Sequence, residues 1–113
     1  MLDWEMAHIG SPFEDIGWFY NWSWDPRARG PRTAVGEWSA FSSEYERLSG
    51  RRITEELLHY WVVFANFKLA IISRSGGWRF VTGKNQDLQQ LAAGATAEHF
   101  EFRALELIGQ GKL

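Results

Sequence analysis

Apolar side chains recur every three or four residues along most of the chain, which is the spacing of one face of an α-helix. The most continuous apolar stretch, from Tyr60 to Ile72, is interrupted only by Asn66 and Lys68. It belongs to a helix predicted to begin at Glu55 and to end near Ser75. Since nearly its whole circumference is apolar, this helix should be the buried core of the chain. Lys68 is expected to reach the surface along its methylene stem, the alternative being a contact with a carboxylate or a phosphate.

Capping residues and glycines set the ends of this central helix. Thr54 should cap its start, with Glu55 and Glu56 in the first turn, where the helix dipole favours acidic side chains. Ser75 and the two glycines after it are expected to break or kink the helix. Residues 78–83 should then form a second short helical piece or a linker.

Three further helices are predicted around the central one. The first should begin at Pro12, where Ser11 and Glu14 have the spacing of a capping box. The second should run from about Val35 to Leu48, and the last from about Gln86 to Gly109. The apolar side of the last helix is expected to carry Leu88, Leu91, Ala95, Phe102 and Leu105.

The first six residues have the alternating pattern of a β-strand, which places Asp3 and Glu5 on one face and Trp4 on the other. Two carboxylates on one face can hold a divalent metal ion, divide acid and base roles as in a glycoside hydrolase, or lie on a solvated edge. An edge strand presents unpaired backbone groups. We therefore expect this strand to pair with the same strand of a second copy or to remain unpaired.

Together these patterns predict a mainly α fold, with one short N-terminal strand and an irregular bundle of four to five helices in a single domain over residues 1–113. The connection from Asn21 to Arg32 contains proline and glycine, so it should be a loop. Its aromatic and guanidinium groups can form the wall of a substrate pocket by stacking and anion contacts, or a hydrophobic anchor with a solvated basic tip. The substrate-side candidates are Trp22, Trp24, Arg27 and Arg29.

The N-terminal segment resembles the stretch that follows the catalytic loop in the aminoglycoside phosphotransferase family of kinase-like enzymes. The resemblance rests on Leu-Asp-Trp-Glu-Met-Ala at residues 2–7, Ile-Gly followed by a small cap residue and Pro at 9–12, and Asp-Ile-Gly-Trp at 15–18. The branch associated with acyl-CoA dehydrogenase proteins looks most similar. Ser11 departs from the aspartate common in relatives, and either residue caps a helix well.

The resemblance implies that this chain corresponds to the helical C-terminal subdomain of a kinase-like fold. In the family, the aspartate matching Asp3 binds magnesium, and the one matching Asp15 supports the catalytic loop through hydrogen bonds. Taken alone, Asp15 is also explained by the helix dipole. The loop with the substrate-side candidates would lie near the acceptor hydroxyl of a small molecule.

Phosphoryl transfer also needs a phosphate cradle, a lysine and a positioning aspartate. The family's catalytic loop, His-Gly-Asp followed by Asn, and its nucleotide-binding lobe would lie upstream of Asp3. Neither is among these 113 residues. The intact family enzyme uses Mg²⁺ and ATP, whereas this chain alone is expected to bind neither and to be inactive.

Composition and charge limit the classes of partner that the chain is expected to bind. A net charge of −2 and a pI near 5.9 argue against nucleic acid. The chain has no cysteine for disulfides or thiolate metal sites, and His8, His59 and His99 match no metal spacing. The first residues do not form a signal peptide, and the apolar stretch 60–72 is shorter than the about twenty residues that cross a bilayer. We expect a cytoplasmic protein without membrane contact.

Seven Trp, eight Phe and three Tyr are more aromatic residues than a core of this size easily covers. We therefore expect an exposed apolar patch, which usually marks an interface, and self-association through it. Three hypotheses follow. The favoured one is the substrate-side part of an ATP-dependent small-molecule phosphotransferase. The second is a dimeric helical interaction module derived from such a kinase, with its carboxylates as relics, and the third is a hydrolase using Asp3 and Glu5.

Overall fold

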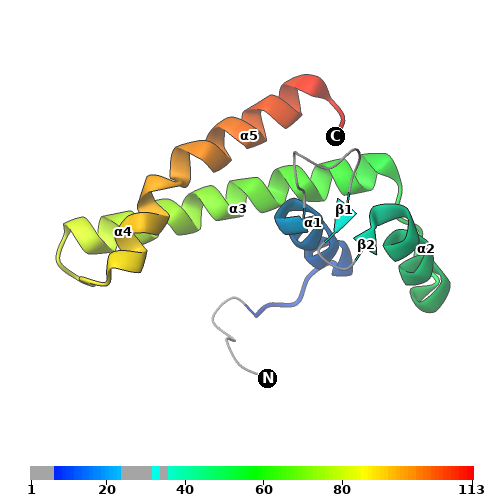
Figure 1. The fold of residues 1–113 in the computed structure, drawn as a ribbon, viewed down its shortest axis with the longest axis horizontal. Helices are drawn as coiled ribbons and strands as arrows, with labels where there is room; N and C mark the ends of the chain where they lie inside the picture. The colour runs from blue at the N-terminus through cyan, green and yellow to red at the C-terminus, as the bar shows by residue number, and fades with distance from the viewer. Residues whose placement is uncertain (1–6, 24–31, 34–35) are drawn as a thin grey trace.

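The computed structural model describes residues 7–23, 32–33 and 36–113. Within that part the fold is mainly α, as predicted, with five helices and one two-stranded hairpin (Figure 1). The predicted N-terminal strand falls on residues 1–6, which lie outside the described ranges. In chain order the elements are α1 (Pro12–Ser23), β1 (Arg32–Thr33), β2 (Gly36–Glu37), α2 (Trp38–Ser49), α3 (Glu55–Val81), α4 (Leu88–Ala95) and α5 (Ala97–Gln110).

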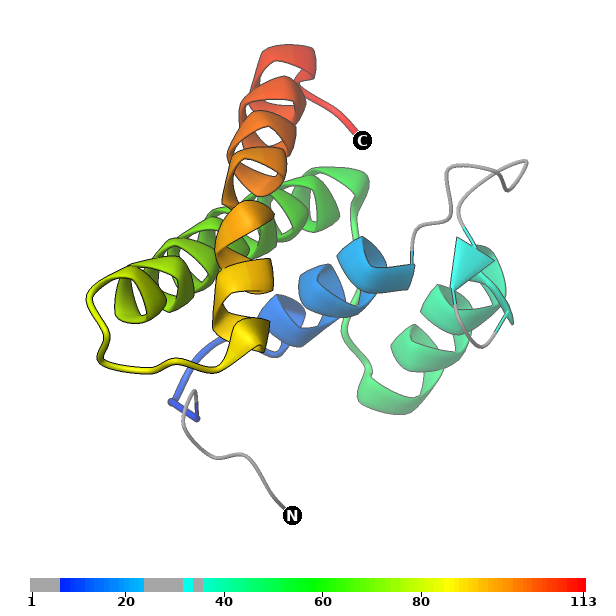
Figure 2. The same cartoon turned by 60° about the vertical axis from the view of Figure 1, so that its left-hand side comes forward.

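Helix α3 is the axis of the fold, because α1, α4 and α5 all pack on it. Its 27 residues correspond to a length of about 40 Å. Helix α1 lies against the N-terminal half of α3 and α4 against its C-terminal half, while α5 returns along α3 in the opposite direction (Figures 1 and 2). The strands β1 and β2 pair antiparallel, with Arg32 opposite Glu37.

The core lies where α1, α3 and α5 meet. It contains Ile16, Leu58, Val62 and Leu107, and Leu107 is completely buried. The prediction that nearly the whole circumference of α3 is buried is wrong. Three other helices cover only part of its surface, so one apolar face remains exposed.

The predicted break at the glycine pair Gly76-Gly77 is also wrong, since α3 continues to Val81. A Cβ atom on Gly94 of α4 would lie 2.6 Å from the Cα of Gly77. These glycines therefore allow two helix backbones to touch, instead of ending a helix. The helix ends at Thr82, whose N–H bonds to the carbonyl of Trp78 over 3.0 Å.

The last predicted helix is two helices, which meet at Thr96. The Thr96 hydroxyl donates to the carbonyl of Ala93 over 2.7 Å, and the turn lets both α4 and α5 pack on α3. The predicted apolar side is wrong as well. Because α5 starts anew after the turn at Thr96, its buried positions are Ala97, Ala104 and Leu107. Leu88 and Leu91 of α4 and Phe102 and Leu105 of α5 are exposed.

The predicted starts of α1 and α3 are confirmed, but the predicted capping box at α1 is not formed. The Thr54 hydroxyl accepts from the Leu57 N–H over 3.2 Å. At α1, Ser11 Oγ accepts from the N–H of Phe13, two residues on, over 3.3 Å. Glu14 forms no reciprocal capping box, because its carboxylate is engaged elsewhere. Within the described ranges no helix combines the length and the apolar character needed to span a membrane.

Candidate functional site

A polar cavity of about 310 Å³ lies at the start of α1. Its walls come from the segment before α1, from the first turn of α1, and from the connection between α2 and α3. The lining residues are His8, Gly10, Ser11, Pro12, Glu14, Asp15 and Arg51. The site is therefore built around the segment that carries the family resemblance.

The Asp-Ile-Gly-Trp motif fixes α1 on α3. The side chain of Ile16 enters the core and is 6% exposed. Gly17 faces the backbone of Trp61, where an added Cβ would lie 2.6 Å from the carbonyl carbon. Since Asp15 directly precedes these two contacts, they fix the backbone that carries its carboxylate at the cavity.

Glu14 is held by two basic side chains. Its Oε1 accepts from Lys68 Nζ over 2.5 Å, and its Oε2 lies 2.8 Å from His8 Nε2. The side chains of Glu14 and Lys68 are only 14% and 22% exposed. Lys68 also lies 5.8 Å from the centre of the Trp18 ring. The lysine thus meets a carboxylate, and the expectation that it only reaches solvent is wrong.

The charged form of Glu14 is favoured in this setting. Partial burial raises the pKa of the carboxyl group, but the hydrogen bonds with Lys68 and His8 and their positive charges outweigh that effect and lower it overall. Glu14 is therefore ionised and fully engaged, so it acts as a structural anion that joins α1 to α3.

We expect Glu14→Gln to lower the free energy of unfolding by about 1–3 kcal/mol near neutral pH, because Lys68 loses a partly buried partner. A lowered folded-state pKa stabilises the fold above the unfolded pKa, and this contribution is lost as the pH falls through the folded pKa. The difference between the wild-type chain and Glu14→Gln should therefore shrink in acid. Urea denaturation across this pH range measures it.

The matched control for this experiment is Glu56→Gln, which changes an exposed glutamate in the first turn of α3. It should alter the free energy of unfolding by less than about 0.5 kcal/mol. A Glu14→Gln effect of equal size at neutral and at acid pH would contradict the ion pair.

Asp15 has a different environment from its neighbour. Asp15 is exposed and lines the cavity. Within the described ranges it has no hydrogen-bond or ion-pair partner. A carboxylate on a fixed helix start, with all its acceptor positions open, can bind backbone N–H groups of another segment.

Of the other predicted site residues, the structure describes only Trp22. Asp3, Trp24, Arg27 and Arg29 lie outside the described residues. Trp22 belongs to the last turn of α1, which ends at Ser23, so the prediction that a loop begins at Asn21 is wrong. Among the described residues there is no group of three or more histidine, aspartate or glutamate side chains that could hold a metal ion.

Sequence reasoning missed the roles of His8, Glu14 and Arg51. The sequence pattern around Glu14 indicated only a capping box. The one sign of an ion pair was Lys68, which lies within an apolar helix and therefore needs a carboxylate partner. The partner of Lys68 lies 54 residues away, and no local pattern identifies it. Arg51 had no signal beyond its place in a connection.

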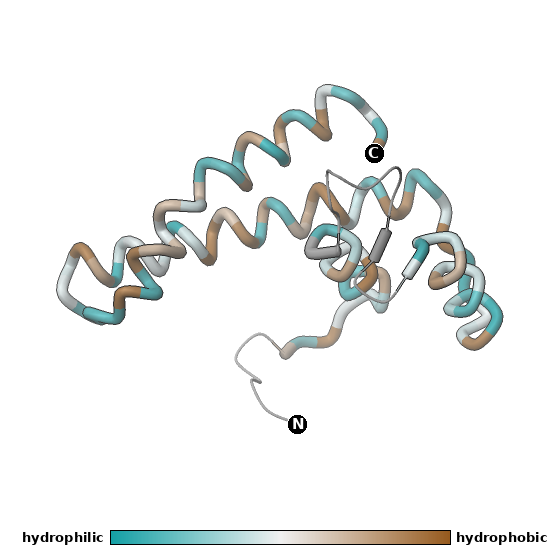
Figure 3. The backbone as a smooth tube through the Cα atoms, in the orientation of Figure 1, coloured by the Kyte–Doolittle hydropathy of each residue, from teal (hydrophilic) through white to brown (hydrophobic). Residues whose placement is uncertain are grey.

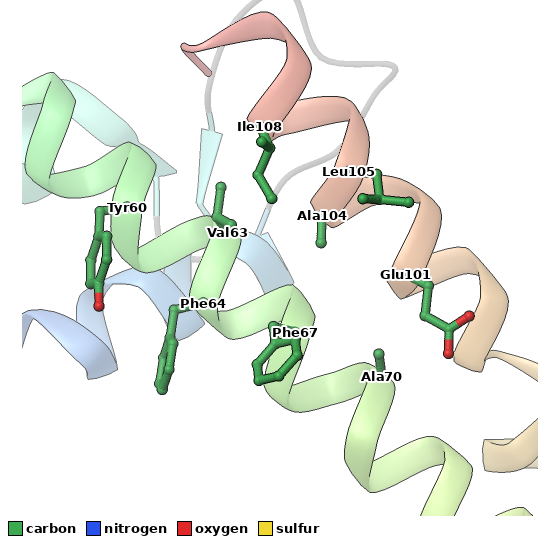
Figure 4. A pocket seen from close by; sticks show the side chains of 9 residues that line it. All are labelled: Tyr60, Val63, Phe64, Phe67, Ala70, Glu101, Ala104, Leu105 and Ile108. Carbon is green, nitrogen blue, oxygen red and sulfur yellow. The ribbon is translucent and has the colours of Figure 1, made fainter.

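A second cavity, of about 500 Å³, is apolar and lies between α3 and α5 (Figure 4). Val63 of α3 and Ala104 and Ile108 of α5 lie between the two helices (Figure 4). At one end, Glu101 accepts two hydrogen bonds from Arg74, over 2.7 and 2.8 Å. We call this cavity and its walls the α3–α5 groove. It fulfils the expectation of an exposed apolar patch.

Comparison of the chain with protein-family models, with curated proteins and with solved structures finds no match in any of the three.

Proposed function

We propose that this chain is the helical, substrate-side part of an ATP-dependent small-molecule phosphotransferase of the aminoglycoside type. The observation that carries the proposal is Asp15, an open carboxylate held at a polar cavity by the buried Ile16 and the close contact of Gly17. The resemblance assigns this position the role of supporting a catalytic loop, and the free acceptor oxygens suit that role.

The chain's own residues would contribute three things to the reaction. Asp3 would bind Mg²⁺, for which a carboxylate oxygen is a suitable ligand. When bound, the ion neutralises charge on the phosphate groups of ATP. Asp15 would accept N–H groups of the catalytic loop, and Glu14, paired with Lys68, would keep α1 in place beneath it.

The acceptor in this proposal is a hydroxyl group of a small molecule. Trp22 in the last turn of α1, and Trp24, Arg27 and Arg29 after it, would lie close to that hydroxyl. Because the nucleotide lobe and the catalytic loop are not among these residues, the 113-residue chain by itself should not turn over ATP. A cytoplasmic location, where ATP is available, belongs to the same proposal.

The test is to isolate the native protein from its source cells with an antibody against this chain, to determine its mass, and to assay transfer of the γ-phosphate of ATP to small hydroxyl compounds. We expect a species several times heavier than 13.1 kDa, or a complex of that size, with transfer activity. Asp3→Asn introduced into the gene should reduce transfer at least about a hundredfold, because a metal ligand acts on the transition state.

The matched control is Glu98→Gln, an exposed acidic residue on α5, which should leave transfer unchanged. An isolated 13.1 kDa chain that hydrolyses ATP, and loses this activity in Asp3→Asn, would overturn the expected inactivity. A native species of 13.1 kDa with no transfer activity would overturn the phosphotransferase proposal itself.

A further inference from the structure

Helices α3 and α5 each carry a second apolar face that no described residue covers. Hydrophobic segments recur along the whole length of both helices (Figure 3). A helix that is apolar on opposite sides is normally buried on both. The exposed side chains and their exposed fractions are Tyr60 58%, Phe67 55% and Ile71 50% on α3, and Phe102 69%, Leu105 68% and Ile108 60% on α5.

These side chains follow helical spacing. On α3, Tyr60, Phe64, Phe67 and Ile71 are separated by four, three and four residues, which is the seam that one helix presents to another in a left-handed pair. On α5, Phe102, Leu105 and Ile108 recur every three residues. Tyr60, Phe64 and Phe67 of the first stripe and Leu105 and Ile108 of the second line the α3–α5 groove. Ile71 and Phe102 extend the two stripes along the same helices. We call the two stripes together the α3–α5 face.

The groove brings no unpaired charge to this face. Its lining is apolar except for Glu101, and that carboxylate is bonded to Arg74. Charge therefore gives no reason to expect a nucleic acid or an ionic ligand. The shape, a trough between two antiparallel helices, suits the ridge of side chains on a further helix.

The exposed area is close to what a stable dimer requires. Each of the six side chains leaves on the order of 100 Å² exposed, given the typical size of large apolar residues. The face therefore offers roughly 600–800 Å², and one partner in a standard interface buries about 800 Å². A face of this size would be unusually large for the surface of a soluble monomer.

We propose that the α3–α5 face binds the same face of a second copy of this chain. A twofold axis places the same patch on both copies. The α3 and α5 helices of the two copies then form a four-helix bundle, in which side chains of each copy enter the groove of the other. This inference concerns the chain itself and does not depend on the phosphotransferase proposal.

Analytical ultracentrifugation of the full chain tests the proposal. The wild-type protein should sediment as a concentration-dependent dimer, with twice the 13.1 kDa chain mass. Leu105→Glu places one unpaired charge from each copy in the proposed apolar interface and should weaken association at least about a hundredfold. Leu105 is exposed, so the variant should retain the wild-type helical circular dichroism, and Phe67→Glu provides an independent second variant on the other helix.

The matched control is Leu88→Glu, a leucine of similar exposure, 72%, on α4 and outside the α3–α5 face. This variant should remain dimeric. A wild-type chain that is monomeric at every concentration would overturn the proposal. So would a dimer that survives both Leu105→Glu and Phe67→Glu, because its interface would then lie elsewhere.

The lack of native cysteines allows a direct geometric check. A single cysteine introduced as Leu105→Cys should allow a bifunctional thiol reagent to cross-link two copies, since a twofold interface brings the same patch of both copies together. Leu88→Cys should not cross-link under the same conditions. Equal cross-linking of the two variants would contradict the assigned face.

Discussion

Gly17→Ala is expected to lower the free energy of unfolding by about 2–4 kcal/mol, because overpacking at a helix contact forces the backbone to move. An added Cβ would lie 2.6 Å from the Trp61 carbonyl carbon, its carbonyl oxygen and its Cβ. Two of these atoms are backbone and the third is fixed to it, so none can rotate away. Helix α1 would have to withdraw from α3, weakening the packing of Ile16 and the Glu14 ion pair at once.

The control for Gly17→Ala is Gly109→Ala, a glycine in α5 that has no neighbouring atom within 4 Å of an added Cβ. Alanine favours a helix by about 1 kcal/mol over glycine, so this variant should be neutral or slightly more stable. Urea denaturation followed by tryptophan fluorescence measures both, at one protein concentration. Similar effects for the two variants would mean that Gly17 does not touch α3.

Leu107→Ala should lower the free energy of unfolding by about 2–5 kcal/mol, the usual range for a leucine truncated inside a core. Leu107 is 0% exposed and packs with Ile16, Leu58 and Val62. The Leu107 carbonyl also lies 3.0 Å from His59 Nε2. This contact holds the α5 backbone against α3, so the structure can close only part of the space that the shortened side chain leaves. The loss would be a large share of the about 5–15 kcal/mol that stabilises a domain.

Leu88→Ala is the matched control for this truncation, because Leu88 is 72% exposed and has little packing to lose. It should change the free energy of unfolding by less than about 1 kcal/mol. Thermal unfolding by circular dichroism ranks the two variants. A Leu107→Ala chain as stable as Leu88→Ala would show that α5 does not close the core.

The sequence predicted those elements whose signals are local. The start of α1 at Pro12 and the cap of α3 at Thr54 depend on residues within one turn, and both are confirmed. The Gly76-Gly77 pair looked like a helix end because glycine has the same local meaning whether it ends a helix or admits a neighbour. Only Gly94, far along the chain and on another helix, decides between these roles.

The division of the last helix at Thr96 also depends on tertiary packing. No proline marks it, and the break exists because α4 and α5 both lie on α3. At the candidate site, Asp15 could be singled out because it belongs to a recognisable motif. The ion pair of Glu14 and Lys68 joins residues 54 positions apart, and sequence periodicity contains no information about such a pair.

Phe67 and Lys68 are neighbours on α3, yet they belong to different parts of the molecule. Successive residues of a helix point about 100° apart. Phe67 therefore lines the α3–α5 groove, whereas Lys68 bonds to Glu14 beside the polar cavity. One turn of α3 thus carries both surfaces. A shift of this turn that moves Phe67 therefore also moves Lys68 and strains its bond with Glu14, so the packing of the groove and the ion pair beside the cavity are mechanically connected.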